Sequence, residues 1–397
     1  MSSRCGIGTR APGARSRRSL ERPSTTRTAA IMYSGTHAVW TGVDAGARSR
    51  YRSGTARTAH TEHGKDQQEP RTKNQEPRTS RRNAPIMAEV LALSGILNVR
   101  KRRGPTSRDV VNAIQACVRP NKVGHAGTLD PLATGVLVVC VGPATRLVEC
   151  IQRMRKRYRA TFRFGWRSDT DDVEGRLERD ERRQPSRDEL TAVLARYHGA
   201  IEQVPPDYSA VKVRGRRAYD LARRGEQVAL RPRAVRIHAM TLVDYAYPDW
   251  TVDVECGSGT YVRSLGRDIA KDLGVSAIMA ALTRESIGLF AIDGAVDPPR
   301  WDAACVAEHL LPIGMAVAEL RRASVSNEQA RRLRAGQRLD IGSVPAVVDP
   351  PGGYAPPGEC GVLPSMGDVA AFDSDGRLVA LIEARSDGWF PVRCFPE

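Results

Sequence analysis

The feature that most constrains the fold of this chain is an unbroken apolar segment, residues 134–142, with the sequence TGVLVVCVG. A strand with one face in water alternates polar and apolar residues, whereas a strand buried on both faces reads as a continuous apolar run. We therefore expect residues 134–142 to form a strand deep inside a sheet.

Residues 157–164 show the opposite pattern, because apolar and polar residues alternate there without exception. This period of two is typical of a strand that is buried on one face only. The apolar side would carry Tyr158, Ala160, Phe162 and Phe164, and the outer side would carry Arg157, Arg159, Thr161 and Arg163.

The segments around these strands predict further elements in an irregular order. Thr106 and Asp109 have capping-box spacing, and so do Ser186 and Glu189, which predicts a helix start at each pair. Because no regular strand–helix–strand rhythm is present, we expect an α+β domain over residues 87–310, with a central mixed or antiparallel sheet flanked by helices. Its other predicted elements are strands at residues 90–99, 235–245 and 251–256 and helices at residues 186–198 and 260–273.

The last part of the chain, residues 311–397, predicts a second and smaller unit. Ser326 has the position of a helix cap. Two predicted strands flank an Asp-Gly turn signal at residues 373–376, and residues 349–358 read as a Pro/Gly-rich loop. We expect a small β-rich domain.

The charge of the chain is uneven. Its formal net charge is +16, but residues 1–86 alone hold 17 Lys or Arg against 6 Asp or Glu, which leaves about +5 for the rest. A basic balance favours a polyanionic partner. Residues 1–86 show no sustained period and cannot bury enough apolar surface to offset the entropy lost on ordering, so we expect a disordered basic extension.

Three explanations of this extension stay open. It is a basic RNA-binding arm, a transit peptide, or a stretch that is not translated, with Met87 as the true start. The last is favoured because ordered-looking sequence begins directly after Met87.

Neither a metal site nor a disulfide framework is expected. The eight cysteines include no Cys-x-x-Cys pair, and the seven histidines show no ligand spacing. The acidic cluster from Asp169 to Glu174 has Val173 where a calcium loop needs an oxygen ligand, and no Glu stands at the twelfth position. Widely spaced thiols fit a cytoplasmic protein, and no apolar run approaches the roughly 20 residues that span a bilayer.

The stretch most informative about function is residues 123–147, VGHAGTLDPLATGVLVVCVGPATRL. Asp130-Pro131 by itself is a common opening of a helix or turn. Here Asp130 lies in a Gly-rich loop that leads into the buried strand. A carboxylate at the rim of an apolar sheet can act as a nucleophile or a base, although spacing alone does not establish this.

The full string resembles the signature of TruB-type tRNA pseudouridine synthases, G-H-[AST]-G-[AT]-L-D-P-x-A-[ST]-G-[VM]-L, without a break from Gly124 to Leu137. Further family-like blocks follow in the expected order, and together they cover nearly all of residues 95–290. These blocks begin at Lys156 (KRY), Gly165 (GWRSDTDDVEG), Pro206 (PDYSAVKVRG), Gly257 (GSGTYVRS) and Ala281 (ALTR).

The resemblance implies a pseudouridine synthase fold with a PUA-like RNA-binding domain at the C-terminus. It also implies that the chain isomerises uridine to pseudouridine at position 55, in the T-loop of tRNA, and needs no cofactor. Asp130 would be the catalytic carboxylate, with attack on the base or on the sugar carbon left open, and Arg263 would hold it ionised. Tyr158 and Tyr261 would contact the flipped base, His125 would lie near the extruded nucleotide, and Leu282 would line the uracil pocket.

Each of these residues also has a simpler interpretation. Arg263 would contact a phosphate, Tyr158 and Leu282 would pack in the core, and His125 would be structural or merely exposed. A further set of basic residues would either meet RNA phosphates or form a solvated basic surface: Arg157, Arg159, Arg163, Lys212, Arg214, Arg216 and Arg217.

One block departs from the family pattern. Its usual form is Lys-Pro-x-Gly-x-[TS]-S, but here Arg102 follows Lys101 in place of the proline. Proline pre-sets a loop backbone. The change therefore puts the local conformation and any role of Lys101 in doubt, but it does not touch Asp130.

The implied partner is the T-arm of tRNA, since a loop nucleotide costs least to extrude. Residues 131–134 (PLAT) resemble the bacterial stand-alone form, so we expect a monomer that needs no guide RNA. Two alternatives stay open: a non-catalytic RNA-binding or tRNA-folding protein, and a guide-RNA-dependent synthase.

Overall fold

The computed structural model describes residues 93–180, 182–209, 230–344, 347–350 and 369–396, with 212–213, 216–217 and 219 between them. The expectations for residues 1–86 and for most of the loop at 349–358 lie outside these ranges. Within them, no helix is both long and apolar enough to cross a membrane.

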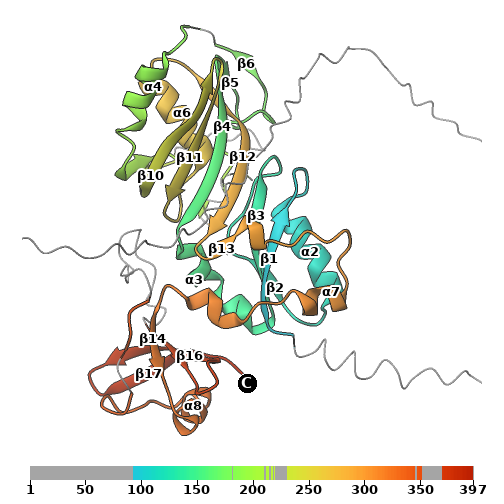
Figure 1. Ribbon diagram of the computed structural model, residues 1–397, viewed down its shortest axis with the longest axis vertical. Coiled ribbons are helices and arrows are strands. Elements are labelled where there is room, and N and C mark those ends of the chain that lie inside the picture. Colours follow the sequence, from blue (N-terminus) through green and yellow to red (C-terminus); the bar gives the residue numbers. More distant parts are fainter. Residues whose placement is uncertain are drawn as a thin grey trace, which may run out of the picture. The chain divides into compact units, whose positions relative to one another are not determined.

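A nine-stranded sheet forms the centre of the protein (Figure 1). Neighbouring strands are antiparallel except for one parallel pair, β3 with β12, which confirms the predicted mixed sheet. In sheet order the main strands are β1 (Gly95–Lys101), β3 (Thr134–Val141), β12 (Ala277–Ile287), β4 (Lys156–Phe164), β11 (Asp249–Cys256), β10 (Arg233–Ala246) and β7 (Gly199–Gln203), while β2 (Val123–His125) pairs with β3 and β13 (Phe290–Ala291) pairs with β12.

Strand β3 is buried on both faces, as its apolar run predicts. Leu137, Val139 and Val141 belong to one hydrophobic cluster, which also contains β4 and β11 residues. Val136 and Val138, on the other face, belong to a second cluster. Two separate cores thus meet across one strand, which is why residues 135–141 are all apolar and buried.

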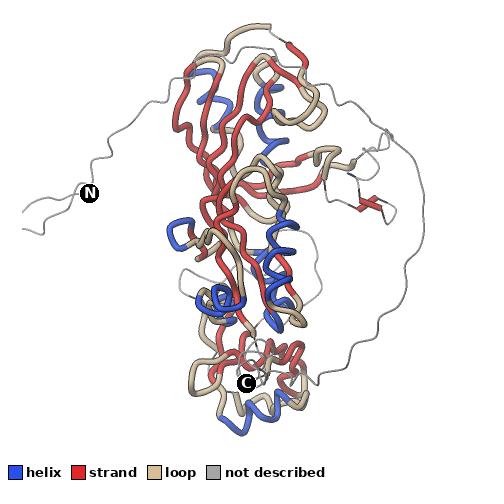
Figure 2. The backbone as a smooth tube through the Cα atoms, turned by 90° about the vertical axis from the view of Figure 1, so that its right-hand side faces the viewer, coloured by secondary structure: helices blue, strands red, loops and turns tan. Residues whose placement is uncertain are grey.

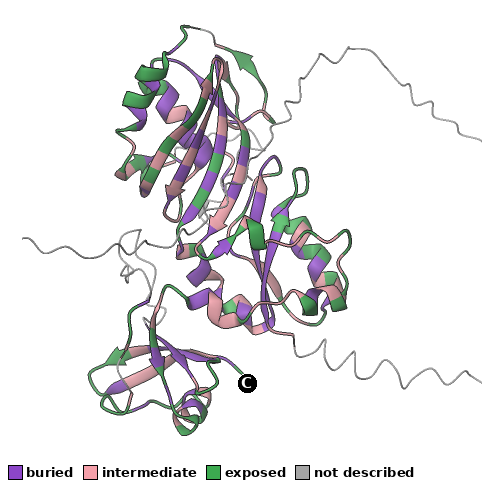
Figure 3. Ribbon diagram, in the orientation of Figure 1, coloured by how far each residue is buried: buried purple, intermediate pink, exposed green. Residues whose placement is uncertain are grey.

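Strand β4 has the predicted half-buried pattern, with buried positions alternating with more exposed ones. Figure 3 shows the same alternation of buried and exposed residues along strands of the sheet. Trp250 on β11 stacks on Phe162 with ring centroids 4.5 Å apart, so aromatic packing fixes the β4–β11 pair at the end farther from Tyr158.

The helices pack against this sheet (Figure 2). Both predicted capping boxes are confirmed, at Thr106–Asp109 and Ser186–Glu189. Helix α6 packs on β12 and β4, while α4 packs on β10. The bounds are α2 (Ser107–Cys117), α3 (Val148–Arg153), α4 (Arg187–Leu194), α6 (Val262–Asp272) and α7 (Ala303–Glu308), with 3-10 turns η1 (Gly142–Leu147), η2 (Ile292–Gly294) and η3 (Ile313–Val317).

Some predicted bounds were wrong. The helix expected at residues 186–198 ends at Leu194, because the amides of Arg196 and Tyr197 donate three residues back, to Val193 and Leu194, and do not continue the helical pattern. The strand expected at residues 90–99 begins at Gly95. Strand β12 was not predicted at all. The short hairpins β5 (Trp166–Arg167) with β6 (Glu178–Arg179) and β8 (Lys212–Val213) with β9 (Arg216–Arg217) were not predicted either.

The C-terminal part forms its own four-stranded sheet, which confirms the predicted β-rich unit. The predicted turn joins β15 to β16, and Ser326 caps α8 with a capping box. Phe372, Leu381 and Phe395 of this part complete the second hydrophobic cluster beneath β3. Its elements are β14 (Arg321–Ser324), α8 (Asn327–Arg334), β15 (Val369–Phe372), β16 (Leu378–Arg385) and β17 (Gly388–Cys394).

Candidate active site

Asp130 lies in the loop that connects β2 to β3, at the edge of the apolar core. Its side chain is 32% exposed, so the carboxylate is accessible to a ligand. The neighbouring Leu129 and Leu132 are buried in the main cluster. The Asp130 carboxylate is therefore accessible to solvent, while its neighbours in the loop are buried in the apolar core, as the sequence predicts.

Two buried side chains fix the backbone of this loop. The Ser107 hydroxyl donates to the carbonyl of Leu129 at 3.1 Å and accepts from its amide at 2.8 Å. The Lys101 ammonium donates to the carbonyl oxygens of Asp130 at 3.1 Å and Ala133 at 2.8 Å. Burial lowers the pKa of Lys101 to about 8.

Arg102, which replaces the usual proline, does not displace Lys101. Its Nε lies 2.6 Å from a carboxylate oxygen of Asp297, at an exposed position. Lys101 itself is only 1% exposed. An exposed ion pair therefore takes the place of the usual proline ring, and Lys101 still binds the loop that carries Asp130.

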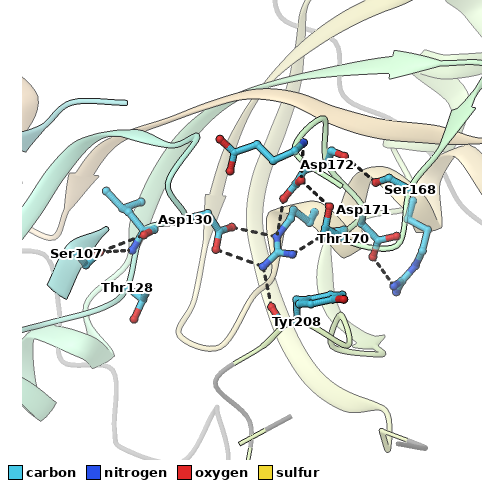
Figure 4. Close-up of polar contacts among 12 residues, drawn as sticks. Ser107, Thr128, Asp130, Ser168, Thr170, Asp171, Asp172 and Tyr208 are labelled. Carbon is cyan, nitrogen blue, oxygen red and sulfur yellow. Dashed lines mark hydrogen bonds and ion pairs between the residues drawn. The ribbon is translucent and has the colours of Figure 1, made fainter. Parts of the chain in front are cut away.

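The second component of the site is Arg263, in the first turn of α6. Its Nε lies 3.0 Å from Oδ2 of Asp130, and its Nη2 lies 3.3 Å from Oδ1. Two further N–H groups donate to the carbonyl oxygens of Thr170 at 2.8 Å and Tyr208 at 3.0 Å. The predicted pairing of Arg263 with Asp130 is thus present, and the guanidinium is held on several sides. Figure 4 labels its partners Asp130, Thr170 and Tyr208.

A second carboxylate, from Asp172, approaches the same guanidinium. Its Oδ2 lies 3.7 Å from Nε of Arg263, and its side chain is 6% exposed. The Thr170 hydroxyl donates to Asp172 at 2.6 Å, and the amide of Glu174 donates at 3.0 Å. Figure 4 shows Asp172 and Thr170 across from Asp130.

Sequence reasoning missed the part played by Asp172. It treated the acidic loop only as a rejected calcium site. The signal was present in the loop's match to a family block, but the contact with Arg263 joins segments about 90 residues apart. Asp171 beside it faces another way, with Nη1 of Arg267 2.8 Å from its carboxylate.

The predicted base-contacting residues come from three further strands and a helix end. Tyr158 on β4 and Leu282 on β12 are both 7% exposed and lie in the same cluster as Leu129. Burial raises the pKa of the Tyr158 hydroxyl, and the Asp130 carboxylate is among the lesser causes. A neutral phenol therefore lies near the carboxylate.

Tyr261 and His125 are half-buried. The Gln203 side chain accepts from the amide of Tyr261 at 2.8 Å and donates to its carbonyl at 3.1 Å, which fixes the residue that precedes α6. Burial lowers the pKa of His125, and the Arg284 charge adds to this. The imidazole is thereby kept neutral near physiological pH.

Comparison with known proteins agrees with this arrangement. The family description "TruB family pseudouridylate synthase (N terminal domain)" matches residues 115–262. The tRNA pseudouridine synthase B of Bradyrhizobium diazoefficiens is 36% identical over 339 residues, which is 83% of this chain and 93% of that protein. This chain belongs to the TruB family. The same-named protein of Thermobifida fusca is 40% identical, over 76% of this chain and 98% of the relative.

Solved structures show a similar fold over most of the chain. A Cbf5-Nop10-Gar1 complex contains a chain with a TM-score of 0.56 and 23% identity, covering 76% of this chain and 81% of that one. An archaeal box H/ACA sRNP Nop10-Cbf5 complex gives 0.52 and 24%. At such identities the likeness concerns the fold alone.

The sequence left two interpretations of the basic outer face of β4, RNA phosphate contacts or a solvated surface, and the structure pairs its arginines with carboxylates. Arg159 and Arg163 each donate two hydrogen bonds, at 2.7 and 2.8 Å, to Asp253 and Asp249 on β11. Arg157 lies 3.9 Å from Glu285. Each of these arginines therefore faces a carboxylate on a neighbouring strand, while its side chain stays about half exposed. The remaining members of the set, Lys212, Arg214, Arg216 and Arg217, have no described side chains.

Proposed function

We propose that this TruB-family protein converts uridine 55 in the T-loop of tRNA to pseudouridine, with Asp130 as its catalytic carboxylate. The observation that carries the assignment of Asp130 is its two-point contact with Arg263 at the rim of the apolar cluster. The relatives that carry the name tRNA pseudouridine synthase B support the substrate.

The reaction moves one bond within the substrate. The bond from the sugar C1′ to N1 of uracil breaks, the base turns, and C1′ bonds to C5; the proton that C5 loses is balanced by one gained at N1. The Asp130 carboxylate starts this exchange as a nucleophile or a base. Arg263 binds both carboxylate oxygens and holds the group in place for this step.

The other site residues would hold the base during this exchange. An enzyme that acts on a base must take it out of its stack. Tyr158 and Leu282 supply the apolar surface against which the flipped uracil rests, and Tyr261 contacts the base from the end of α6. His125, neutral and half-buried, lies near the extruded nucleotide.

The division of labour along the chain is also part of the proposal. Residues 87–310 form the catalytic domain, and residues 311–397 form a PUA-like domain that binds RNA. The enzyme acts in the cytoplasm as a monomer without a guide RNA.

The test uses purified protein and an unmodified tRNA transcript, with no second protein and no guide RNA. Chemical labelling maps pseudouridine, and Asp130→Asn is run in parallel. We expect pseudouridine at the T-loop uridine with the wild type and none with the variant. Tight binding without product from either protein would favour a non-catalytic RNA-binding role or a guide-dependent enzyme instead.

A further inference from the structure

Arg284, on β12, is a charged side chain buried directly behind the catalytic loop. It is 1% exposed and ranks among the largest fully buried side chains. Among the residues that the structure describes, none forms an ion pair with its guanidinium. A buried charge without a counter-ion is costly unless its hydrogen bonds are well made.

The hydrogen bonds of Arg284 all go to the two ends of the Asp130 loop. Its Nε donates to the carbonyl of Val136 at 2.7 Å, and its Nη2 donates to the carbonyl of Gly127 at 3.0 Å. Nη1 reaches the carbonyl of Thr128 at 3.4 Å. The planar fork therefore joins the peptide that precedes the catalytic residue to the strand that follows it.

Arg284 also acts on Tyr158, because its charge lowers the pKa of the Tyr158 hydroxyl against the larger effect of burial. The two residues face each other in the β12–β4 register. On its other side Arg284 pairs with Gly135 of β3, where a Cβ would lie 2.2 Å from the carbonyl oxygen of Arg284. Strands β3, β12 and β4 thus lie side by side at the position of Arg284.

We propose that Arg284 is a positioning residue, which fixes the spacing between the Asp130 carboxylate and the Tyr158 ring by binding the supports of both. It touches neither the base nor the reacting atoms. Displacing a reacting group by about 1 Å can cost about 100-fold in rate, so a loosened loop should lower turnover more than substrate binding. This inference rests on the proposed pseudouridine synthase activity.

The primary variants are Arg284→Lys and Arg284→Gln. Lysine keeps the charge but has no planar fork, so it cannot satisfy the same set of carbonyl oxygens. We expect kcat on saturating tRNA to fall by about tenfold or more in both, with the dissociation constant for tRNA within about threefold of the wild type. The alkaline limb of the pH–rate profile should also shift if the Tyr158 environment changes, because the pKa of this phenol is raised by burial.

Trp250→Phe is the control for a loss of kcat that results from lower stability alone. Trp250 is 1% exposed and packs on Phe162, away from Tyr158. This variant should lose thermal stability and keep its kcat. If Arg284→Lys keeps the wild-type kcat, or if Trp250→Phe loses as much kcat at a matched Tm, the proposal is overturned.

Tyr158→Phe tests the same positioning role from the Tyr158 side, because it removes the hydroxyl and adds no atom to the core. It decides the question if both Arg284 variants fail to fold. Reduced kcat with unchanged tRNA affinity supports the link, and unchanged kcat overturns it. A wild type that forms no pseudouridine would instead refute the proposed function, so the two failures are distinguishable.

Discussion

Arg263 reaches Asp130 through two nitrogens, with Nε 3.0 Å from Oδ2 and Nη2 3.3 Å from Oδ1. The pair lies between a loop of the sheet and the first turn of a helix, 133 residues apart in sequence. The remaining N–H groups of the guanidinium hold the backbone of two more loops. One side chain therefore fixes the geometry of the whole site.

Arg263→Lys should lower kcat by about 100-fold or more, because an ammonium cannot make the two-point contact and also bind the carbonyls of Thr170 and Tyr208. Single-turnover kinetics on saturating tRNA measure this. Arg196→Lys, at an exposed ion pair with Asp272, serves as the matched control and should stay at the wild-type rate. Equal rates for the two variants would show that Arg263 has no role in the reaction.

Asp172→Asn should lower kcat by about tenfold with little change in tRNA affinity. The amide keeps the shape of the carboxylate but removes the negative charge that lies 3.7 Å from Arg263. Asp169→Asn in the same loop is the control, since Asp169 is exposed and accepts only from the amide of Arg176. The role of Asp172 would be refuted by similar rates in both variants.

Lys101 should make stability depend on alkaline pH. Its pKa falls from 10.5 to about 8 on folding, so below pH 8 both states are protonated and the cost of the buried charge is fully present. Between these values the unfolded chain binds more protons, so stability rises with pH. Between pH 7.5 and 10, the free energy of unfolding in urea should rise for the wild type by on the order of 1–3 kcal/mol relative to Lys101→Met. A constant difference would contradict this.

The outer face of β4 should contribute little to tRNA binding, because its arginines are already paired. The double change Arg159→Gln with Asp253→Asn removes one such pair without altering the net charge. Each lost phosphate contact would lower the slope of log K against log salt by about 0.7–0.9. We expect the slope to stay unchanged, and a drop of that size would restore Arg159 as a phosphate ligand.

A protein that begins at Met87 should retain the kcat of the full chain within about twofold, since residues 1–86 lack the apolar pattern of a folded unit. Pseudouridine formation on the same transcript is compared for the two proteins. A large loss of turnover on truncation would mean that residues 1–86 take part in catalysis. A loss confined to KM would favour a basic RNA-binding arm.

The sequence was a good guide where local pattern decides structure. The alternation at residues 157–164 predicted β4, and two capping boxes and the cap at Ser326 marked real helix starts. It failed at β12, whose sequence AIMAALTRESI does not alternate. Register shifts between Met279 and Ala281 and between Arg284 and Ser286 interrupt its pairing with β4. A bulged strand changes the face of its side chains, so a period of two cannot reveal it.

By itself the sequence determined the buried strand β3, the exposed carboxylate before it, and the family through a contiguous motif. Each of these depends on residues that are neighbours in the chain. Only the tertiary structure decided that Asp172 shares Arg263 with Asp130, that the Arg284 guanidinium binds carbonyl oxygens on both sides of Asp130, and that the β4 arginines face carboxylates of neighbouring strands. These contacts join segments brought together by strand order and helix packing, and that order follows from the burial of apolar surface by the whole chain, which no local pattern contains.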